Sequence, residues 1–471
     1  MSYYLERMMR YYYSILLALV IPLHVFGVPD YDCVVVGAGI SGAAAAQALQ
    51  SKGLRVLVVE ARNRIGGRLY TEETTLSNGE DFQVDLGASW IHGASRSNPL
   101  VALVKNSGRT VSTTDYDNDD TYYSDGQSVP NAELRKYEDT WDEFTSFLAK
   151  EQYQYDQDPG LQTVVDSFIR RKKLTGLDLR AFRYNLNVNI VGEYAAPISN
   201  LSLWFDEDEG FDGDDVLVLG GYQGVAEYLA RDVDVVLQTR VTGIDYSSSD
   251  YVTVNAKESG DGSLKSYTAK TVIVTLPLGV LKENSVRFTP ALPKVNRDAI
   301  NALGFGLLNK CVLIFTRAFW GSDIEFIERI DKRGKSGFEE TLSLMPAADA
   351  PVLYGFNAAT YAYTLEKKSD EETCKEMMAA LERIWENAPG YVECFVSRWA
   401  SDPYSKGSYS YTTPLMEYKK AHKDVGRAVG NGMVQFAGEH TSLKNPATVH
   451  GALGSGYDAS CRVLRKLGKQ C

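Results

Sequence analysis

The chain has 471 residues, of which 44% are apolar and 23% are charged, as expected for a globular protein with a large core. Its 61 Asp and Glu residues outnumber its 49 Lys and Arg residues, which argues against nucleic acid as a partner because such a partner normally requires a basic face. A chain of this length is expected to form two domains.

A secretory signal peptide is predicted at residues 1–27. Arg7 and Arg10 give the segment a basic start, and an apolar run from Ile15 to Gly27 follows. The alternative is an N-terminal membrane anchor, but this run is short for a span and Pro22 interrupts it. We therefore expect a secreted protein with no membrane contact after removal of the signal peptide, and a glycosylation sequon at Asn200 fits that location.

The six cysteines are too few for a disulfide scaffold. Cys33 and Cys311 lie inside apolar, strand-like runs and are expected to be buried thiols. Any disulfide is expected among the remaining four, whose pairing the sequence leaves open, namely Cys374, Cys394, Cys461 and Cys471. No Cys-x-x-Cys motif or Cys/His cluster in the sequence indicates a metal site.

A strand, a glycine-rich turn, a helix and a second strand follow one another from residue 32. Asp32–Val36 is a short apolar run typical of a buried parallel strand. GAGISG comes next, then AAAAQALQSKG predicts a helix that ends at Gly53, and Arg55–Val59 predicts the second strand, closed by Glu60. This order predicts a βαβ unit whose acidic residue has the spacing of a dinucleotide-binding fold.

The glycines of GAGISG have distinct expected roles. Gly37 makes the tight turn, Gly39 lets a pyrophosphate approach the backbone, and Gly42 lets helix and strand pack closely. The N-terminus of the helix offers free N–H groups and a partial positive charge to the phosphates. Glu60 can accept hydrogen bonds from the adenosine ribose hydroxyls. Together these features predict a dinucleotide site.

A second glycine pair follows in RNRIGGRLYT, residues 62–71. Arg62, Gly67 and Arg68 belong to a second clamp, in which backbone amides and a guanidinium reach the same pyrophosphate or the flavin side of the nucleotide. A dissociable NAD does not usually need such a clamp. FAD is therefore the expected cofactor.

These motifs resemble those of the flavin-containing amine oxidase family, which includes polyamine oxidases, monoamine oxidases and related L-amino-acid oxidases. The resemblance covers residues 31–467 and rests on GAGISG, VVEARNRIGGR, DLGASWIHG, LNKCVLIFTRAFW, VSRWASDPYSKGSYSY and FAGEHTSLKNPATVHGALGSG. It is closest to the spermine-oxidase-like polyamine oxidases. Family members with covalent flavin carry a cysteine where this chain has LKNPATVHG, so the resemblance implies noncovalent FAD.

The resemblance implies an α/β fold of two domains. A Rossmann-like FAD-binding domain would be assembled from three discontinuous segments, residues 31–98, 217–290 and 402–467. A substrate-binding domain of α+β type, a mixed sheet with helices, would take residues 99–216 and 291–401. Residues 115–126, DYDNDDTYYSDG, are expected to form a surface loop.

The resemblance also assigns roles around the flavin. Val241 would contact the adenine, Trp399 would lie by the flavin ring, and Gly438 and Glu439 belong to the second FAD motif, with Glu439 on the ribityl chain. Lys310 lies in an apolar strand, where an ammonium is costly to bury. In the family this lysine holds a water beside the reactive flavin nitrogen, so a catalytic role is expected.

The substrate side is predicted from five further positions. His92 in SWIHG stands where spermine-oxidase-like members have histidine, and it can hydrogen-bond the substrate amine and share protons near neutral pH. Glu193 could bind a distal ammonium, while Tyr194 and Tyr409 would line the tunnel and attract alkylammonium groups by cation–π contact. Thr448 replaces a tyrosine of the family's aromatic cage, which disfavours a monoamine oxidase, and is expected beside both substrate and cofactor.

The sequence thus predicts a monomeric FAD-dependent polyamine oxidase that converts spermine- or spermidine-type amines and O2 to an aldehyde, a shorter amine and H2O2. The acidic run at residues 206–215 could attract such a polycation. An L-amino-acid oxidase is the alternative within the family and would need a cation such as Arg183 or Arg398 for the substrate carboxylate. A non-catalytic flavin- or amine-binding protein is the alternative from another class. The preferred polyamine, and the side of its secondary amine that is oxidised, stay open.

Overall fold

The computed structural model describes residues 29–205, 211–333, 337–415 and 417–471. The predicted signal peptide and residues 206–210 of the acidic run lie outside this set. Within it, residues Tyr31–Cys471 form a single compact unit. None of the described helices combines the length and the apolar character that a bilayer crossing requires.

The predicted βαβ unit is present at the start of the described chain. It consists of β1 (Tyr31–Val36), α2 (Ile40–Ser51) and β2 (Val56–Val59). The two strands are parallel, with Val36 opposite Val59, and both are buried because they lie inside a larger sheet. α2 packs against the C-terminal helix α14 (Val449–Lys466), where a Cβ on Gly456 would lie 2.2 Å from the Ser41 carbonyl oxygen. Close contact between these two helices, distant in sequence, therefore needs glycine.

β1 and β2 belong to an eight-stranded sheet. Its order is β13 (Arg287–Thr289), β10 (Thr239–Asp245), β11 (Val252–Glu258), β12 (Leu264–Val274), β1, β2 and β9 (Val235–Val236), with β21 (Val434–Phe436) also paired with β12. All of these strands come from the three segments predicted for the FAD-binding domain. Parallel strands flanked by α2, α7 (Gln223–Ala230) and α14 confirm the α/β class, while the domain limits themselves stay a prediction.

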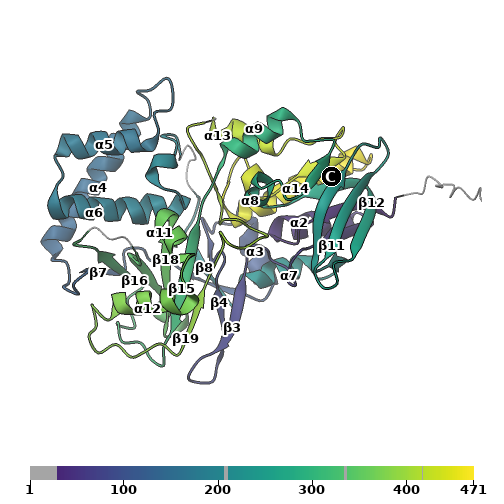
Figure 1. The fold of residues 1–471 in the computed structure, drawn as a ribbon. Helices are drawn as coiled ribbons and strands as arrows, with labels where there is room; N and C mark the ends of the chain where they lie inside the picture. The colour runs from purple at the N-terminus through teal and green to yellow at the C-terminus, as the bar shows by residue number, and fades with distance from the viewer. Residues whose placement is uncertain (1–28, 206–210, 334–336, 416) are drawn as a thin grey trace, which may run out of the picture. The chain divides into compact units, whose positions relative to one another are not determined.

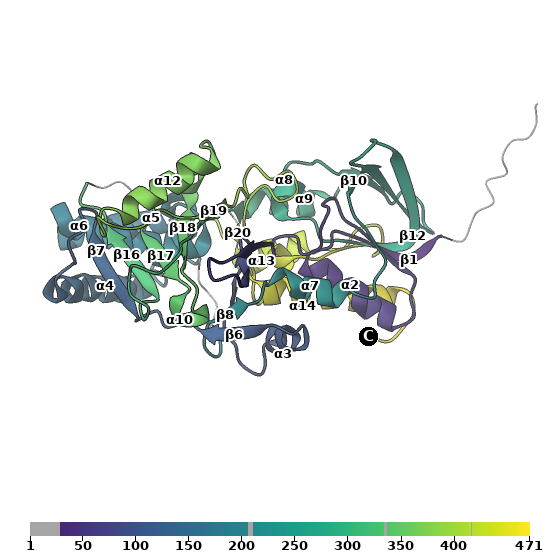
Figure 2. The ribbon, with the colours of Figure 1, turned by 90° about the horizontal axis from the view of Figure 1, so that it is seen from below.

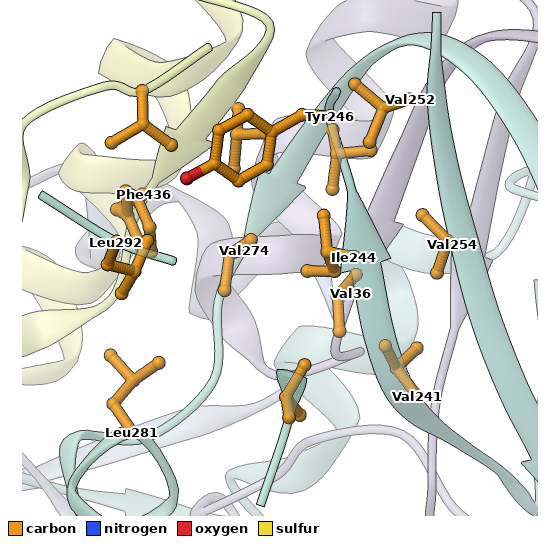
Figure 3. Packing of buried hydrophobic residues seen from close by; sticks show 14 of the residues in the cluster. Val36, Val241, Ile244, Tyr246, Val252, Val254, Val274, Leu281, Leu292 and Phe436 are labelled. Carbon is orange, nitrogen blue, oxygen red and sulfur yellow. The ribbon is translucent and has the colours of Figure 1, made fainter. Parts of the chain in front are cut away.

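An apolar core lies against this sheet, and Figure 3 shows part of it. Val36 at the end of β1 lies near Val241 and Ile244 of β10, and Val274 ends the neighbouring strand β12. Burying each such side chain contributes about 1.5–3 kcal/mol relative to leaving it in water. The core therefore fixes the strand ends from which the glycine-rich turn at Gly37 departs.

A six-stranded sheet comes from the other stretches of the chain. Its order is β19 (Glu393–Val396), β15 (Leu308–Ile314), β18 (Val352–Ala358), β17 (Glu340–Ser343), β16 (Phe326–Ile330) and β7 (Asp119–Tyr123). The helices α4 (Asn131–Glu151), α5 (Leu161–Lys172) and α6 (Gly176–Leu186) lie together near β7 and β16 in both views (Figures 1 and 2). Their shared core is aromatic, with Phe144, Phe168 and Phe182 in mutual ring contact.

The expectation of a surface loop at residues 115–126 was wrong for its central part. Asp119–Tyr123 is strand β7, which pairs in parallel with β16. Thr121 and Tyr123 are buried on one face of this strand. The aspartates that surround it hid the alternation of buried and exposed side chains by which a strand is recognised.

Smaller elements join the two sheets. They are the ribbon of β3 (Thr71–Thr75) and β4 (Asp81–Asp85), the three-stranded sheet of β5 (Trp90–Ile91), β8 (Val216–Leu219) and β6 (Thr110–Thr113), and the pair β14 (Gly304–Phe305) and β20 (Ser410–Tyr411). The remaining α-helices are α3 (Pro99–Asn106), α8 (Leu278–Lys282), α9 (Lys294–Ala302), α10 (Met345–Ala348), α11 (Ala359–Leu365), α12 (Asp370–Leu381) and α13 (Tyr418–Val425).

The cysteines divide as the sequence predicted. Disulfides join Cys374 to Cys394 and Cys461 to Cys471, while Cys33 and Cys311 are buried free thiols. Burial raises the pKa of Cys33 to about 12, so this thiol stays protonated and unreactive at neutral pH. The first disulfide ties α12 to β19 and so holds a helix against the six-stranded sheet.

Candidate functional site

A cavity of about 1080 Å3 is bounded by residues from both sheets and their connections. Every predicted site residue except Gly42 lines it. Those predicted for the cofactor are Gly37, Gly39, Glu60, Arg62, Gly67, Arg68, Val241, Trp399, Gly438, Glu439 and Thr448. Those predicted for catalysis or substrate are His92, Glu193, Tyr194, Lys310 and Tyr409.

At two of the three glycines in the turn after β1 an added side chain would clash with the backbone or a neighbour, and at the third it would not. A Cβ on Gly37, whose φ is +104°, would lie 2.6 Å from the Thr275 hydroxyl oxygen, and a Cβ on Gly42 would lie 2.0 Å from the Gly37 carbonyl oxygen. A Cβ on Gly39 would meet only the Gly66 carbonyl oxygen, at 3.8 Å. Gly39 therefore borders free space in the cavity at the N-terminus of α2, where unpaired N–H groups favour an anion.

The carboxylate of Glu60 is held by the turn that it faces. Its Oε2 accepts a hydrogen bond from the Ala38 N–H at 2.7 Å and its Oε1 accepts one from the Arg62 N–H at 2.8 Å. The guanidinium of Arg62 donates two hydrogen bonds to Asp402, at 2.6 and 2.9 Å. This bidentate ion pair joins the second glycine segment to the C-terminal stretch of the chain. Because the charge of Arg62 is already paired, its main role is to form part of the cavity wall.

A second ion pair joins the partly buried Arg68 to the buried Glu439. Arg68 Nη1 donates to Glu439 Oε1 at 2.9 Å and to the Ser408 carbonyl oxygen at 2.7 Å. The other oxygen of Glu439 accepts hydrogen bonds from the Ser410 hydroxyl at 2.6 Å and the Ala447 N–H at 2.9 Å. Burial opposes the charge on Glu439, but Arg68, His440 and Ser410 outweigh it, so the pKa of this carboxyl is lowered and it stays ionised.

The lining fits FAD at each of these points. The open side of Gly39 offers room for a pyrophosphate, Glu60 lies beside it, and Val241 gives an apolar wall near the start of β10. The indole of Trp399 lines the same cavity and is fixed by its N–H, which donates to the Leu86 carbonyl oxygen at 3.2 Å. Thr448 caps α14: its hydroxyl accepts from the Gly451 N–H and donates to the Asn445 carbonyl oxygen.

Lys310 lies on β15 with its ammonium buried. Nζ donates to the carbonyl oxygens of Asp85 at 3.0 Å and Gly87 at 2.6 Å, and to the Ser89 hydroxyl. Burial lowers the pKa of Lys310, while the carboxylate of Asp85 favours its charged form. All three N–H groups of an ammonium are thus used, so a water bound to Nζ, as the resemblance implies, would have to replace one of these partners.

His92 and Asp215 form a hydrogen-bonded pair at the edge of the three-stranded sheet. β5 and β8 are antiparallel with Ile91 opposite Val216, and the next pair in that register is His92 opposite Asp215. His92 Nδ1 lies 2.8 Å from Asp215 Oδ2, and His92 lines the cavity, so Nε2 is the ring nitrogen that Asp215 does not occupy. Burial disfavours the imidazolium, but Asp215 and Glu193 outweigh burial and raise the pKa of His92.

Glu193, Tyr194 and Tyr409 meet beside a π-helical turn, η1 (Asn187–Gly192). Such turns are often found at functional sites. The Tyr409 hydroxyl donates to the Gly192 carbonyl oxygen at 3.0 Å, which fixes the wall next to Glu193, and Tyr194 packs edge-on against Phe205. The structure therefore brings an acidic side chain and aromatic rings to one part of the cavity.

Several cavity residues were not predicted individually from the sequence. Asp215 belongs to the acidic run, but nothing local marked it as the partner of His92. Its Oδ2 also accepts a hydrogen bond from the Tyr116 hydroxyl at 3.1 Å. Phe356, Glu328 and Glu340 line the cavity from the six-stranded sheet, and their positions follow only from strand register.

Comparisons with known proteins agree with this geometry. The family model described as flavin containing amine oxidoreductase matches residues 40–464. Polyamine oxidase 5 of Oryza sativa subsp. japonica is 32% identical, with 93% of this chain and 88% of that protein covered. Polyamine oxidase 2 of Arabidopsis thaliana is also 32% identical, with 93% and 89% covered.

Two further matches are more distant or partial. Lysine-specific histone demethylase 1 homolog 1 of Arabidopsis thaliana is 30% identical over 93% of this chain, but the match covers 53% of that protein. A double mutant of putrescine oxidase has the same fold, with a TM-score of 0.72, 21% identity and coverage of 92% of this chain and 99% of that one. The chain belongs to the flavin-containing amine oxidoreductase family, and it is an FAD-dependent oxidoreductase that acts on amines.

Proposed function

We propose that this enzyme is a polyamine oxidase that acts on spermine- or spermidine-type amines, with O2 as the acceptor and an aldehyde, a shorter amine and H2O2 as products. One observation carries the proposal: the cavity that holds the FAD-binding residues also holds the carboxylates of Asp215 and Glu193 among aromatic rings. Ammonium groups are the natural partners of such a lining. The curated relatives named polyamine oxidases support the same reading.

The chain's own residues would orient the amine and manage its protons. When bound, FAD would supply the acceptor for a hydride from the carbon next to an uncharged amine nitrogen, and dioxygen would take up the electrons. His92 lines the cavity, and its Nε2 atom, which Asp215 does not occupy, could exchange a proton with that nitrogen. Lys310 lines the cavity with its ammonium bound to two carbonyl oxygens and the Ser89 hydroxyl, and it could hold a water near the reacting atoms if that water replaced one of these partners.

An L-amino-acid oxidase is less well supported by the cavity. Its substrate carries a carboxylate, which needs an unpaired cation. In the described part of the lining, Arg62 and Arg68 are already paired with Asp402 and Glu439. Arg240 also lines the cavity, but it is exposed and lies next to Val241, on the side expected to hold the adenine. The two arginines considered from the sequence, Arg183 and Arg398, do not line the cavity, and Arg398 is bound to Asp370.

Secretion, noncovalent FAD and a monomeric state complete the proposal. The signal peptide at residues 1–27 and the two disulfides support an oxidising compartment. The absence of cysteine in LKNPATVHG supports noncovalent attachment. N-terminal sequencing of the secreted protein, release of FAD on denaturation and light scattering would test these three statements separately.

The decisive experiment offers the FAD-loaded enzyme a panel of spermine, spermidine, their acetylated forms, n-butylamine and L-lysine. Peroxide release and mass spectrometry of the products identify the substrate and the bond that is cleaved. We expect turnover of at least one polyamine with kcat/KM at least 100-fold above that for n-butylamine or L-lysine, consistent with about 3 kcal/mol of extra binding. Preference for L-lysine or n-butylamine would overturn the proposal.

A further inference from the structure

Residues 399–407 form a loop whose two ends meet. The Gly407 N–H donates a hydrogen bond to the Trp399 carbonyl oxygen at 2.8 Å. Compact loops with joined ends are frequently functional elements, because they can move while their ends stay in place. Four side chains of this loop line the cavity of about 1080 Å3 (the FAD cavity), namely Trp399, Pro403, Tyr404 and Lys406.

An ion pair joins the loop to the segment that follows β2. Arg62 donates to both carboxylate oxygens of Asp402, and only 12% and 19% of the two side chains are exposed. Asp402 Oδ1 also accepts a hydrogen bond from the Tyr404 N–H at 2.8 Å, and the Arg62 guanidinium lies 5.4 Å from the centre of the Tyr404 ring. Bidentate, charge-assisted pairs are among the stronger hydrogen-bonded contacts in proteins. The Arg62–Asp402 ion pair therefore holds the loop against the FAD-binding side of the cavity.

The loop also packs against α8, where its ion pair is more exposed. A Cβ on Gly279 would lie 2.6 Å from the Ser405 carbonyl oxygen, so the loop and the helix are in close contact. Lys406 Nζ lies 3.0 Å from Glu283 Oε1, with 28% and 47% of the two side chains exposed. Exposed ion pairs contribute little to stability. The Arg62–Asp402 pair is thus the stronger of the two ionic contacts that hold the loop.

The Arg62–Asp402 pair stands between the FAD cavity and a second, outer pocket of about 370 Å3. Arg62 and Tyr404 line both cavities, whereas Asp402, among the described lining residues, belongs to the outer pocket alone. Three residues that line the outer pocket are exposed to solvent, namely Asn63, Gln238 and Ser259. Separation of the ion pair would therefore connect the FAD cavity to solvent through the outer pocket.

We propose that the 399–407 loop closes over bound FAD, and that the Arg62–Asp402 ion pair controls how fast FAD enters and leaves. The loop lines the FAD cavity and is tied to chain segments on both of its sides, so a cofactor beneath it is released only when the loop opens. Asp402 is then a positioning residue that acts on FAD exchange through Arg62 and the loop. This role does not depend on which amine the enzyme oxidises.

A residue that controls opening differs kinetically from one that contacts the cofactor. Loss of a contact to bound FAD raises Kd, chiefly through koff. Loss of the Arg62–Asp402 pair destabilises the closed loop whether or not FAD is bound, so kon and koff rise together and Kd changes little. Both rates can be measured without following amine oxidation.

The test measures FAD exchange in the wild type and in Asp402→Asn. Replacement of the holoenzyme's FAD by an excess of isotopically labelled FAD gives koff, and stopped-flow mixing of apoprotein with FAD gives kon. We expect both rates to rise by roughly 30-fold in Asp402→Asn, the scale of a lost partner in a buried charge pair. The Kd should stay within about threefold of the wild-type value, because the closed loop is weakened with and without FAD.

Two further variants separate the ion pair from other effects of the substitution. Asp402→Glu keeps a carboxylate and should return both rates toward the wild-type values. Arg62→Gln removes the same pair from the other side, and combining it with Asp402→Asn should raise kon no further, as expected for two residues that act through one contact. Thermal unfolding of each apoprotein separates faster exchange from loss of folding.

The matched control lies on the other side of the loop. Glu283→Gln removes the exposed pair with Lys406 and should change either rate by no more than about threefold. Wild-type values of kon and koff in folded Asp402→Asn would overturn the proposal. So would a rise in koff alone with a matching rise in Kd, an equal effect of Glu283→Gln, or FAD that stays covalently attached on denaturation.

Discussion

His92 Nδ1 lies 2.8 Å from Asp215 Oδ2, although 123 residues separate the two in the chain. The contact arises because β5 and β8 are antiparallel and continue their register by one pair. Asp215 also accepts hydrogen bonds from the Gly93 N–H at 3.0 Å and the Tyr116 hydroxyl at 3.1 Å, so its position is fixed. The pair therefore sets both the orientation and the protonation of the imidazole that faces the cavity.

Replacing Asp215 by Asn should move the ionisation of His92 to lower pH. Asp215 raises the pKa of His92 in the folded protein, so its loss lowers that pKa, by about one pH unit for a neighbouring opposite charge. If neutral His92 is the active form, the acid limb of kcat/KM against pH shifts in the same direction. Tyr116→Phe is the control, because it removes a hydrogen bond to Asp215 without removing the charge. An acid limb that does not move in Asp215→Asn would exclude His92 as the titrating group.

The same pair contributes to stability in a defined pH range. Because the folded-state pKa of His92 lies above its unfolded value of about 6.5, the stabilisation is fully present below that pH and is lost as the pH rises through the folded pKa. The difference in Tm between the wild type and His92→Phe should therefore shrink from pH 6 to pH 9. A difference that grows with pH would show that the folded-state pKa is lowered instead.

Lys310→Met should slow turnover by about 100-fold, the scale of a lost proton-transfer group, while leaving FAD bound. The substitution leaves the carbonyl oxygens of Asp85 and Gly87 without their donor, so some loss of stability accompanies it. Stopped-flow measurement of flavin reduction and of reoxidation shows which step depends on the lysine. Lys282→Met is the control, since Lys282 also donates to a carbonyl oxygen but does not line the cavity. Wild-type rates in both steps would remove Lys310 from the mechanism.

The parts of the site that could be predicted from sequence are those made by neighbours in the chain. Gly37, Gly39 and Glu60 belong to one βαβ unit, so their spacing alone predicted the turn and the acidic residue that closes it. Glu60 in fact accepts hydrogen bonds from backbone N–H groups of the turn and of Arg62. These bonds depend on the backbone conformation, which the spacing of residues in the sequence does not specify.

The parts that could not be predicted depend on strand register between distant segments. Asp215 faces His92, and Glu340 faces Glu328, only because particular strands pair in particular registers. A slip of one residue would turn each carboxylate to the opposite face. Neither stretch shows a clean alternation of polar and apolar residues, because the cavity face mixes carboxylates with aromatic rings, as Glu328 and Phe326 on β16 show. A charged cavity wall thus hides the pattern by which buried strands are recognised.

Two thiols, and no more, should react when the protein is unfolded without a reductant. Cys33 and Cys311 are free, while the other four cysteines form the two disulfides. Thiol titration in denaturant checks this count, and all six should react after reduction. Closing a 20-residue separation, as Cys374–Cys394 does, stabilises the fold by about 3 kcal/mol in the chain-entropy model, so reduction should lower the free energy of unfolding. Four or six reactive thiols before reduction would contradict the pairing.

Gly39→Ala and Gly42→Ala should separate cofactor binding from folding. Gly39 has a φ of −71°, which alanine adopts freely, and its Cβ would meet only the Gly66 carbonyl oxygen at 3.8 Å. The folded apoprotein should therefore lose no more than about 1 kcal/mol, the scale of an alanine at a helix N-cap. The same methyl group would occupy the space that a pyrophosphate needs, so the Kd for FAD should rise by about 100-fold.

Gly42→Ala should instead destabilise the fold, with a smaller direct effect on FAD binding. Its Cβ would lie 2.0 Å from the Gly37 carbonyl oxygen, so either α2 or the turn must move, and overpacking of this kind costs about 1–3 kcal/mol. Thermal unfolding of the two apoproteins, together with FAD binding followed by flavin fluorescence, measures both effects. A Gly39→Ala protein that binds FAD as the wild type does would show that the pyrophosphate does not approach the backbone at this turn. The assignment of the glycine turn after β1 to FAD would then be wrong.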